Sequence, residues 1–206
     1  DGSGSMVADR FRGKRLNSPN DAVVRSDGTI YFTDPPYGVE PQARELEFSG
    51  VYRVPAGGGP PAPRPGSGPA PSTVEGPLLV SSEFKMPNGL AFSPDERTLY
   101  VNDTEGGVIR AFEVAQDGST KPPRAFATIT SPDGMKVDVE GNVWCTSAEG
   151  VEVFDPAGAR RGVVRFPEQP ANCAFGGKDR KTLYVTARTG LYRIRVGVAG
   201  LPAGPR

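Results

Sequence analysis

Hydrophobic and polar residues alternate along most of the chain, in short runs that end at turn residues. Clear runs of this kind cover residues 22–24, 30–32, 51–54, 99–101 and 191–194. A period of two places alternate side chains on opposite faces of a strand. Corners such as Asp27-Gly28 and Glu140-Gly141 indicate tight hairpin loops, because their central residues need positive φ and glycine supplies it without a clash. No stretch shows the apolar spacing of a helix, so the pattern predicts an all-β protein.

One segment with this pattern occurs four times. The copies are NDAVVRSDGTIYFTD from Asn20, NGLAFSPDERTLYVND from Asn88, DGMKVDVEGNVWCTS from Asp133 and NCAFGGKDRKTLYVTA from Asn172. Repeats of roughly 40 residues with several short strands each are typical of a β-propeller. The repeat units run from about residue 16 to 84, 85 to 129, 130 to 167 and 168 to 196. We therefore expect four blades of a β-propeller in a single domain that covers residues 1–206.

The first repeat is long because it contains a segment of different composition. Residues 55–77 are rich in Pro, Gly, Ala and Ser. Such a segment cannot bury enough apolar area to offset the entropy of ordering it. We interpret it as an inserted loop between two strands of the first blade, and expect it to be mobile and dispensable. A proline-rich ligand motif is the alternative interpretation.

The residues that begin the repeats are the candidates for chemistry. In a propeller the start of each innermost strand faces the central channel, so Asn20, Asn88 and Asp133 are expected to converge on one axis. Converging oxygen donors indicate a hard cation. Taken singly, Asn88-Gly89 and Asp133-Gly134 also fit ordinary turns. Recurrence at the same phase of the repeat favours the metal site over the turns.

Composition removes several function classes. The formal net charge is zero, which gives no support to a nucleic acid or an anionic membrane as partner. No run of about 18 apolar residues predicts a membrane span. The chain has no histidine, which excludes a histidine general base, a Ser-His-Asp triad and a histidine-bound zinc. Cys145 and Cys173 lie in apolar contexts and are expected to be buried free thiols.

Several motifs, in a fixed order, carry a resemblance to a known family. They are LNSPND at 16–21, FTDPPYG at 32–38, MPNGLAFSPDERTLYVND at 86–103, SPDGMKVDVEGNVW at 131–144 and NCAFGG at 172–177. Together they resemble the SMP-30/gluconolactonase/regucalcin-like family. The resemblance implies a six-bladed propeller with a divalent cation, usually calcium, in its channel. It also implies that about four of six blades are present, with the first blades and a glutamate ligand upstream of Asp1.

The resemblance implies residue roles. Asn20, Asn88 and Asp133 align with the metal-site residues, while Asn20, Ser18 and Tyr37 are candidate substrate contacts. Asp133 is the only carboxylate among the aligned positions. We expect it to be a cation ligand and also the catalytic residue, either as general base or as nucleophile.

The implied function is hydrolysis of a sugar-type lactone, with Ca²⁺ or another divalent cation polarising the carbonyl. Two alternatives stay open, a phosphotriester hydrolase and a calcium-binding scaffold without catalysis. The expected partner is a small-molecule lactone, and the oligomeric state is left open. Because no leader precedes the first repeat, the expected location is cytoplasmic, with periplasm and secretion as alternatives.

Asp34 and Asp103 follow a second strand in their repeats and are expected to cap turns.

Overall fold

The computed structural model describes residues 4–57 and 76–202. In that part of the chain every regular element is a β-strand except one short 3₁₀ turn, η1, at Pro41–Ala43. No helix of the described residues is long and apolar enough to cross a membrane. The middle of the proline-rich segment, residues 58–75, lies outside the described residues, so its expected mobility remains a prediction.

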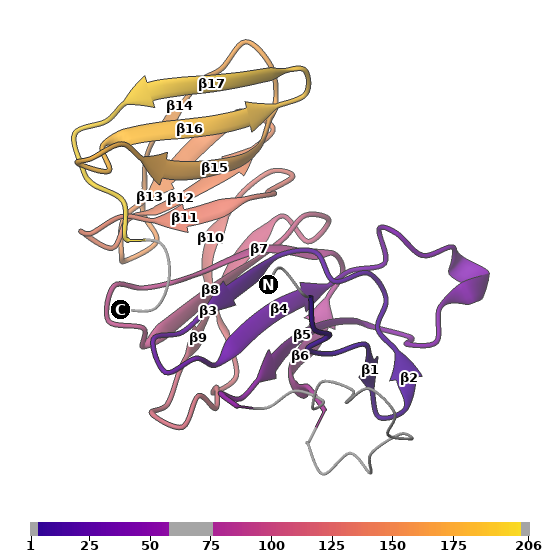
Figure 1. The fold of residues 1–206 in the computed structure, drawn as a ribbon. Helices are drawn as coiled ribbons and strands as arrows, with labels where there is room; N and C mark the ends of the chain where they lie inside the picture. Colours follow the sequence, from indigo (N-terminus) through magenta and orange to yellow (C-terminus); the bar gives the residue numbers. More distant parts are fainter. Residues whose placement is uncertain (1–3, 58–75, 203–206) are drawn as a thin grey trace.

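The strands form four consecutive antiparallel sheets, which we call blades 1 to 4 (Figure 1). Blade 1 contains β3 (Ala22–Val24), β4 (Ile30–Asp34), β5 (Ser49–Val54) and β6 (Leu78–Phe84). Blade 2 contains β7 (Pro87–Phe92), β8 (Thr98–Asp103), β9 (Val108–Glu113) and β10 (Arg124–Thr128). Blade 3 contains β11 (Met135–Val137), β12 (Val143–Ser147), β13 (Gly150–Phe154) and β14 (Arg160–Val164). Blade 4 contains β15 (Pro170–Gly176), β16 (Thr182–Ala187) and β17 (Gly190–Arg195). A hairpin of β1 (Arg10–Phe11) and β2 (Lys14–Arg15) precedes them.

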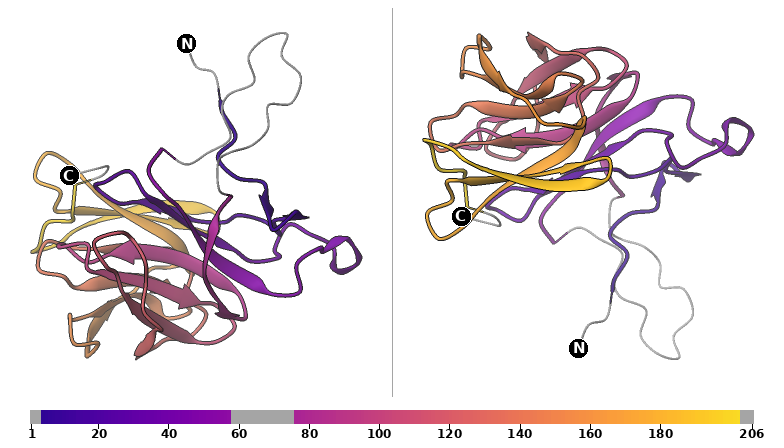
Figure 2. Two further views of the ribbon diagram at one scale, coloured as in Figure 1. Left: turned by 90° about the horizontal axis from the view of Figure 1, so that it is seen from below. Right: turned by 90° about the horizontal axis from the view of Figure 1, so that it is seen from above.

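The first strands of the blades lie next to one another. β3 contacts β7, β7 contacts β11, and β11 contacts β15. Two further views show the sheets following one another in a fan (Figure 2). The four predicted repeat units therefore correspond to the four sheets, and the all-β propeller architecture is confirmed. The strand order within each sheet follows the chain, as the tight hairpins require.

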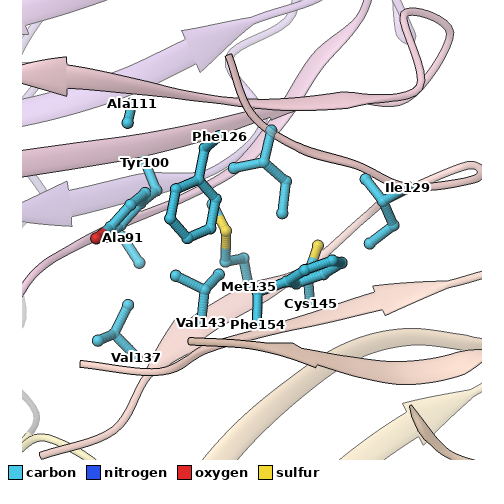
Figure 3. Packing of buried hydrophobic residues seen from close by; sticks show 11 residues of the cluster. Ala91, Tyr100, Ala111, Phe126, Ile129, Met135, Val137, Val143, Cys145 and Phe154 are labelled. Carbon is cyan, nitrogen blue, oxygen red and sulfur yellow. The ribbon is translucent and has the colours of Figure 1, made fainter. Parts of the chain in front are cut away.

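The hydrophobic core is divided into layers between the blades. Between blades 2 and 3, Tyr100 and Phe126 pack with Met135, Cys145 and Phe154 (Figure 3). A similar layer joins blades 1 and 2, and another joins blades 3 and 4. Each layer depends on the alternation in the sequence, because every second residue of a strand faces the neighbouring sheet.

Both cysteines are free and buried, as expected. Cys145 lies in the layer between blades 2 and 3, while Cys173 lies in the layer between blades 3 and 4. Burial raises the pKa of the Cys145 thiol strongly and that of Cys173 to about 11. Neither thiol is therefore a nucleophile near neutral pH.

The predicted hairpin corners form, but at each of them the acidic residue before the glycine does not have the positive φ that was expected. At the first corner only Gly28 has positive φ, at 90°, and its N–H donates to the Arg25 carbonyl. Asp27 instead accepts the Thr29 N–H with its carboxylate. The corner at Gly141 likewise places only the glycine at positive φ, at 84°. At each corner an aspartate carboxylate accepts backbone N–H groups of the turn, Asp27 at the first and Asp138 at the second, and only the glycine has positive φ.

A recurring buried hydrogen bond ties each blade to the next. In blade 1, Thr33 Oγ1 donates to the carbonyl of Asn88 at 2.8 Å. In blade 2, Asn102 Nδ2 donates to the carbonyl of Asp133 at 2.6 Å, and in blade 3 Thr146 Oγ1 donates to that of Ala171 at 3.0 Å. The three donors come from equivalent second strands and are fully buried. We call these bonds the blade ties.

Glycines permit the close approach that the blade ties need. A Cβ on Gly89 would lie 2.3 Å from the Asp133 carbonyl oxygen, and one on Gly134 would lie 2.1 Å from Asn172 Oδ1. Neither glycine has positive φ. The turn interpretation of Asn88-Gly89 and Asp133-Gly134 is therefore wrong, because both glycines serve contact between blades and Gly89 lies inside β7.

We predict that Gly89→Ala destabilises the protein by about 1–3 kcal/mol, because the added methyl group meets a backbone oxygen that cannot move freely. Urea unfolding measures the effect. Gly162→Ala is the matched control, since a Cβ at Gly162 meets nothing within 4 Å and its φ is not positive. Equal stability of the two variants would contradict the proposed role of Gly89.

Candidate functional site

A polar cavity of about 330 Å³ lies at the leading ends of the innermost strands. Its lining comes from all four blades and consists of Asn20, Tyr37, Asn88, Thr104, Ser131, Pro132, Asp133 and Gln169. The fold therefore brings Asn20, Asn88 and Asp133 together, as the repeat predicts, and Tyr37 joins them. Oxygen-bearing side chains dominate this lining.

The same innermost strands form a second cavity at their other ends. It measures about 350 Å³ and is lined almost wholly by apolar side chains, among them Val23, Phe92 and Phe175. Its one charged lining residue is Lys136, whose Nζ donates to the Met135 carbonyl. This cavity has no group suited to acid–base work beside a bound substrate. The polar cavity is therefore the candidate site.

The orientation of Asn88 is fixed by its neighbours. Its Nδ2 lies 3.2 Å from Thr104 Oγ1 and 3.4 Å from the Tyr37 hydroxyl, and donates to both. Thr104 in turn donates to the Pro132 carbonyl at 2.7 Å. Since the amide nitrogen is engaged, the Asn88 oxygen is the group left to act as an acceptor or cation ligand. Asn88 is buried, which holds it in this orientation.

Asp133 is fixed through its backbone. Its N–H donates to the Thr146 carbonyl, and its own carbonyl accepts bonds from Gly89 N–H and Asn102 Nδ2. The carboxylate is half-buried, and this burial raises its pKa above the ordinary value of an aspartate. Hydrogen bonding with Asn88 opposes the rise, while the charge of Asp21 adds to it. Asp21 therefore acts on the site as a second carboxylate.

Two residues with related sequence signals do not line this cavity. Ser18 Oγ accepts the Gly38 N–H at 3.1 Å, so Ser18 joins two loops beside the cavity. Asn172 begins the fourth repeat, but its Oδ1 accepts the Cys173 N–H at 2.8 Å. In blade 4 the lining residue is Gln169, three positions earlier. The substrate role of Ser18 remains a prediction.

Sequence reasoning missed three polar lining residues, namely Thr104, Ser131 and Gln169. Thr104 directly follows Asp103 at the end of β8, a position that the repeat could have indicated. Ser131 and Gln169 lie in connections between blades, where the repeat pattern is weakest. Only the fold shows that these connections reach the channel.

Asp34 and Asp103 cap the segments that lead to the site, as expected. Asp34 accepts the N–H groups of Asn17 and Ser18 at 2.8 and 2.7 Å. Asp103 accepts those of Lys85 and Met86, each at 2.9 Å. The two aspartates occupy equivalent positions in blades 1 and 2. They hold the chain just before Asn20 and Asn88, so they position the site without lining it.

The donor chemistry of the cavity fits a hard divalent cation. Within the described residues no three His, Cys, Asp or Glu side chains form a metal cluster, so a cation here needs amide oxygens. Calcium accepts amide and carboxylate oxygens together and takes six to eight of them. Asn20, Asn88 and Asp133 offer three, with the negative field of Asp21 nearby. The remaining positions would be left to water or substrate.

Comparison with known proteins agrees with this architecture. Residues 1–189 match the family model described as the SMP-30/gluconolactonase/LRE-like region. A gluconolactonase from Zymomonas mobilis is 33% identical to the chain over 95% of it and 55% of that protein. The chain therefore spans about half the length of this curated relative.

Solved structures with a similar fold agree with this result. A gluconolactonase from Xanthomonas campestris is 36% identical, with a TM-score of 0.75, over 98% of this chain and 63% of that one. Regucalcin from Agrobacterium tumefaciens, described as a calcium-binding protein, gives a TM-score of 0.68 over 88% of this chain and 61% of that one. At 21% identity the second likeness shows the fold alone.

We predict that Asp133→Asn raises the unfolding temperature at pH 7 when a chelator is present. The folded-state pKa of Asp133 lies above its unfolded value, so the charged form destabilises the folded state. That destabilisation is complete above the folded pKa and absent below the unfolded pKa of about 3.9. The gain should therefore vanish when the same measurement is made at pH 3.

Asp117→Asn is the control for this experiment. Hydrogen bonds from Ser119 are the main cause of a lowered pKa for the exposed Asp117, which is a shift of opposite sign. Its replacement should not raise the unfolding temperature at pH 7. The burial of Asp133 would be an incorrect explanation if both variants gained stability alike.

Proposed function

The chain belongs to the SMP-30/gluconolactonase/LRE-like family, and from this premise we propose that it hydrolyses a sugar-type lactone with the help of a divalent cation. The observation that carries the proposal is the polar cavity, where Asp133 meets two asparagine amides. Relatives named gluconolactonase that align with nearly all of this chain support it. Because the chain spans about half the length of this curated relative, the activity of the whole protein is part of what we propose.

Asn20, Asn88 and Asp133 would hold the cation, with Ca²⁺ as the first candidate. When bound, the cation would polarise the lactone carbonyl and stabilise the negative charge that develops on its oxygen. The remaining ligand positions would stay open to substrate and water. This arrangement needs no histidine, in agreement with the composition of the chain.

Asp133 supplies the base in this proposal. A water molecule attacks the lactone carbonyl carbon and gives a proton to the Asp133 carboxylate. The protonated Asp133 then returns this proton to the ring oxygen as the bond between that oxygen and the carbonyl carbon breaks, which releases the open-chain hydroxy acid. Burial raises the pKa of this carboxylate in the cation-free protein, which favours proton acceptance, while a bound cation would act in the opposite direction. Direct attack by Asp133 on the carbonyl is the alternative, and the geometry leaves both open.

The rest of the cavity fits a polyhydroxylated substrate. Tyr37, Ser131 and Gln169 are exposed and place a phenol, a hydroxyl and an amide around the opening. These groups both donate and accept hydrogen bonds, which suits the hydroxyls of a sugar lactone. We therefore assign substrate orientation to this rim. Ser18 would act on it indirectly, through its bond to Gly38.

We predict that Asp133→Asn lowers the turnover of D-glucono-1,5-lactone by on the order of a hundredfold or more, the usual loss for a catalytic acid–base group. The amide has a similar shape but cannot accept the proton. The measurement is pH-stat hydrolysis with calcium, on this chain and on any longer reading frame that contains it. Asp117→Asn is the control and should retain full activity. Activity of Asp133→Asn equal to that of the parent protein would sink the proposal.

We predict a different result for the two amides. Asn20→Ala and Asn88→Ala each remove one neutral ligand, so they should weaken calcium binding while leaving the base in place. Activity should then recover in part as calcium is raised. Calorimetric calcium titration gives the affinity independently of turnover. Calcium binding without lactone hydrolysis in the parent protein would favour the scaffold alternative, and hydrolysis unaffected by chelation would remove the cation from the mechanism.

A further inference from the structure

A second polar cavity, of about 360 Å³, lies beside blade 1 and outside the candidate active site. One wall is the segment around Arg15 and Asn17, and the other is the connection from β4 to β5, which carries η1. This connection projects away from the sheets, next to the β1–β2 hairpin (Figure 1). The charged and polar lining consists of Arg15, Asn17, Glu40, Arg44 and Glu45.

Two of the charged residues neutralise each other. Glu45 accepts the Arg15 backbone N–H at 2.7 Å and its Nε at 2.5 Å. These bonds from Arg15 are the main cause of the lowered pKa of Glu45. The pair closes one wall of the cavity, and the charge of each side chain is balanced by the other.

Arg44 differs from Arg15. It is half-buried, has no ion pair within 4.0 Å in the part of the chain described here, and keeps a buried Nε without an acceptor among those residues. Burial raises the pKa of Asp34, and the positive charge of Arg44 lowers it by a smaller amount. Both oxygens of Asp34, however, already accept backbone N–H groups from Asn17 and Ser18. The Arg44 guanidinium is therefore a half-buried cation that has no carboxylate partner of its own among the described residues.

Asn17 provides a complementary feature. It is only 7% exposed, and its Nδ2 donates to the carbonyls of Asp34 and Phe48 at 3.1 and 3.0 Å. Those two bonds fix the amide, while its Oδ1 has no donor among the described residues. A buried acceptor without a donor is destabilising, so a ligand that supplies a hydrogen there gains affinity. The cavity thus combines one fixed acceptor, Asn17 Oδ1, with one half-buried cation, Arg44.

We propose that this cavity binds a small carboxylate that also bears a hydroxyl group. The planar guanidinium of Arg44 matches a carboxylate. Asn17 Oδ1 is fully buried in the ligand-free protein, and a small side-chain movement on binding lets the ligand hydroxyl donate to it. A singly charged group suits the site better than a phosphate dianion, because Glu40 lies on the same lining and Arg44 is the one cation there that no carboxylate among the described residues neutralises. The hydroxy acids formed by lactone ring opening belong to this chemical class, but the assignment rests on Arg44 and Asn17 and not on the proposed reaction.

The test is calorimetric titration of the full chain with D-gluconate in the presence of a chelator, so that no cation site contributes. Sorbitol has the hydroxyls without the carboxylate, acetate has the carboxylate without the hydroxyls, and inorganic phosphate is the dianion. We expect D-gluconate to bind at least tenfold more tightly than each of these three. Equal affinity for sorbitol, or tighter binding of phosphate, would overturn the proposal.

Variants locate the binding. Arg44→Gln should lower the affinity for D-gluconate at least tenfold, and Arg44→Lys should restore part of it, because the charge returns without the planar fork. Arg165→Gln is the control, since Arg165 directly follows β14 in blade 3, is exposed and does not line this cavity. Circular dichroism confirms that each variant is folded. Unchanged affinity in Arg44→Gln, or loss of affinity in Asp133→Asn, would place the ligand elsewhere and overturn the assignment.

Discussion

The blade ties are the interaction on which the rest of the structure depends. Each tie takes a buried side chain from the second strand of one blade and bonds it to the backbone carbonyl at the start of the next blade. Two of the carbonyls belong to Asn88 and Asp133, which line the candidate site. A buried donor without its acceptor is costly, so the ties fix both the angle between blades and the positions of the site residues. Fold and site therefore share one set of hydrogen bonds.

The residues that hold the site in place are different from the side chains that line it. Thr33, Asn102 and Thr146 are fully buried and donate only to backbone or buried groups. The side chains that begin the blades are free to vary, because the ties use their backbone carbonyls. Blade 4 illustrates this freedom, since the tie reaches Ala171 and the lining residue is Gln169. A propeller can therefore change its channel chemistry without changing its frame.

The sequence predicted those features that repeat and missed those that depend on one contact. Strand positions, blade limits and the convergence of Asn20, Asn88 and Asp133 follow from a pattern that occurs in every unit, so each copy supports the others. The roles of Gly89 and Gly134 could not be read this way, because a glycine in a turn and a glycine under a neighbouring blade have the same local sequence. Ser131 and Gln169 were missed because they lie in connections between blades whose path only the fold determines.

The electrostatics of Asp133 follow from the same geometry. The tie from Asn102 and the bond from Gly89 hold its backbone, which fixes the point from which the half-buried carboxylate extends and keeps it within the field of Asp21. In the absence of a cation this raises the pKa and destabilises the folded state at neutral pH. A bound divalent cation would reverse the sign of that contribution, because it stabilises the charged form. The same charged carboxylate therefore lowers the stability of the cation-free protein and would contribute affinity for a cation. The rigid ties keep its backbone in place in both states.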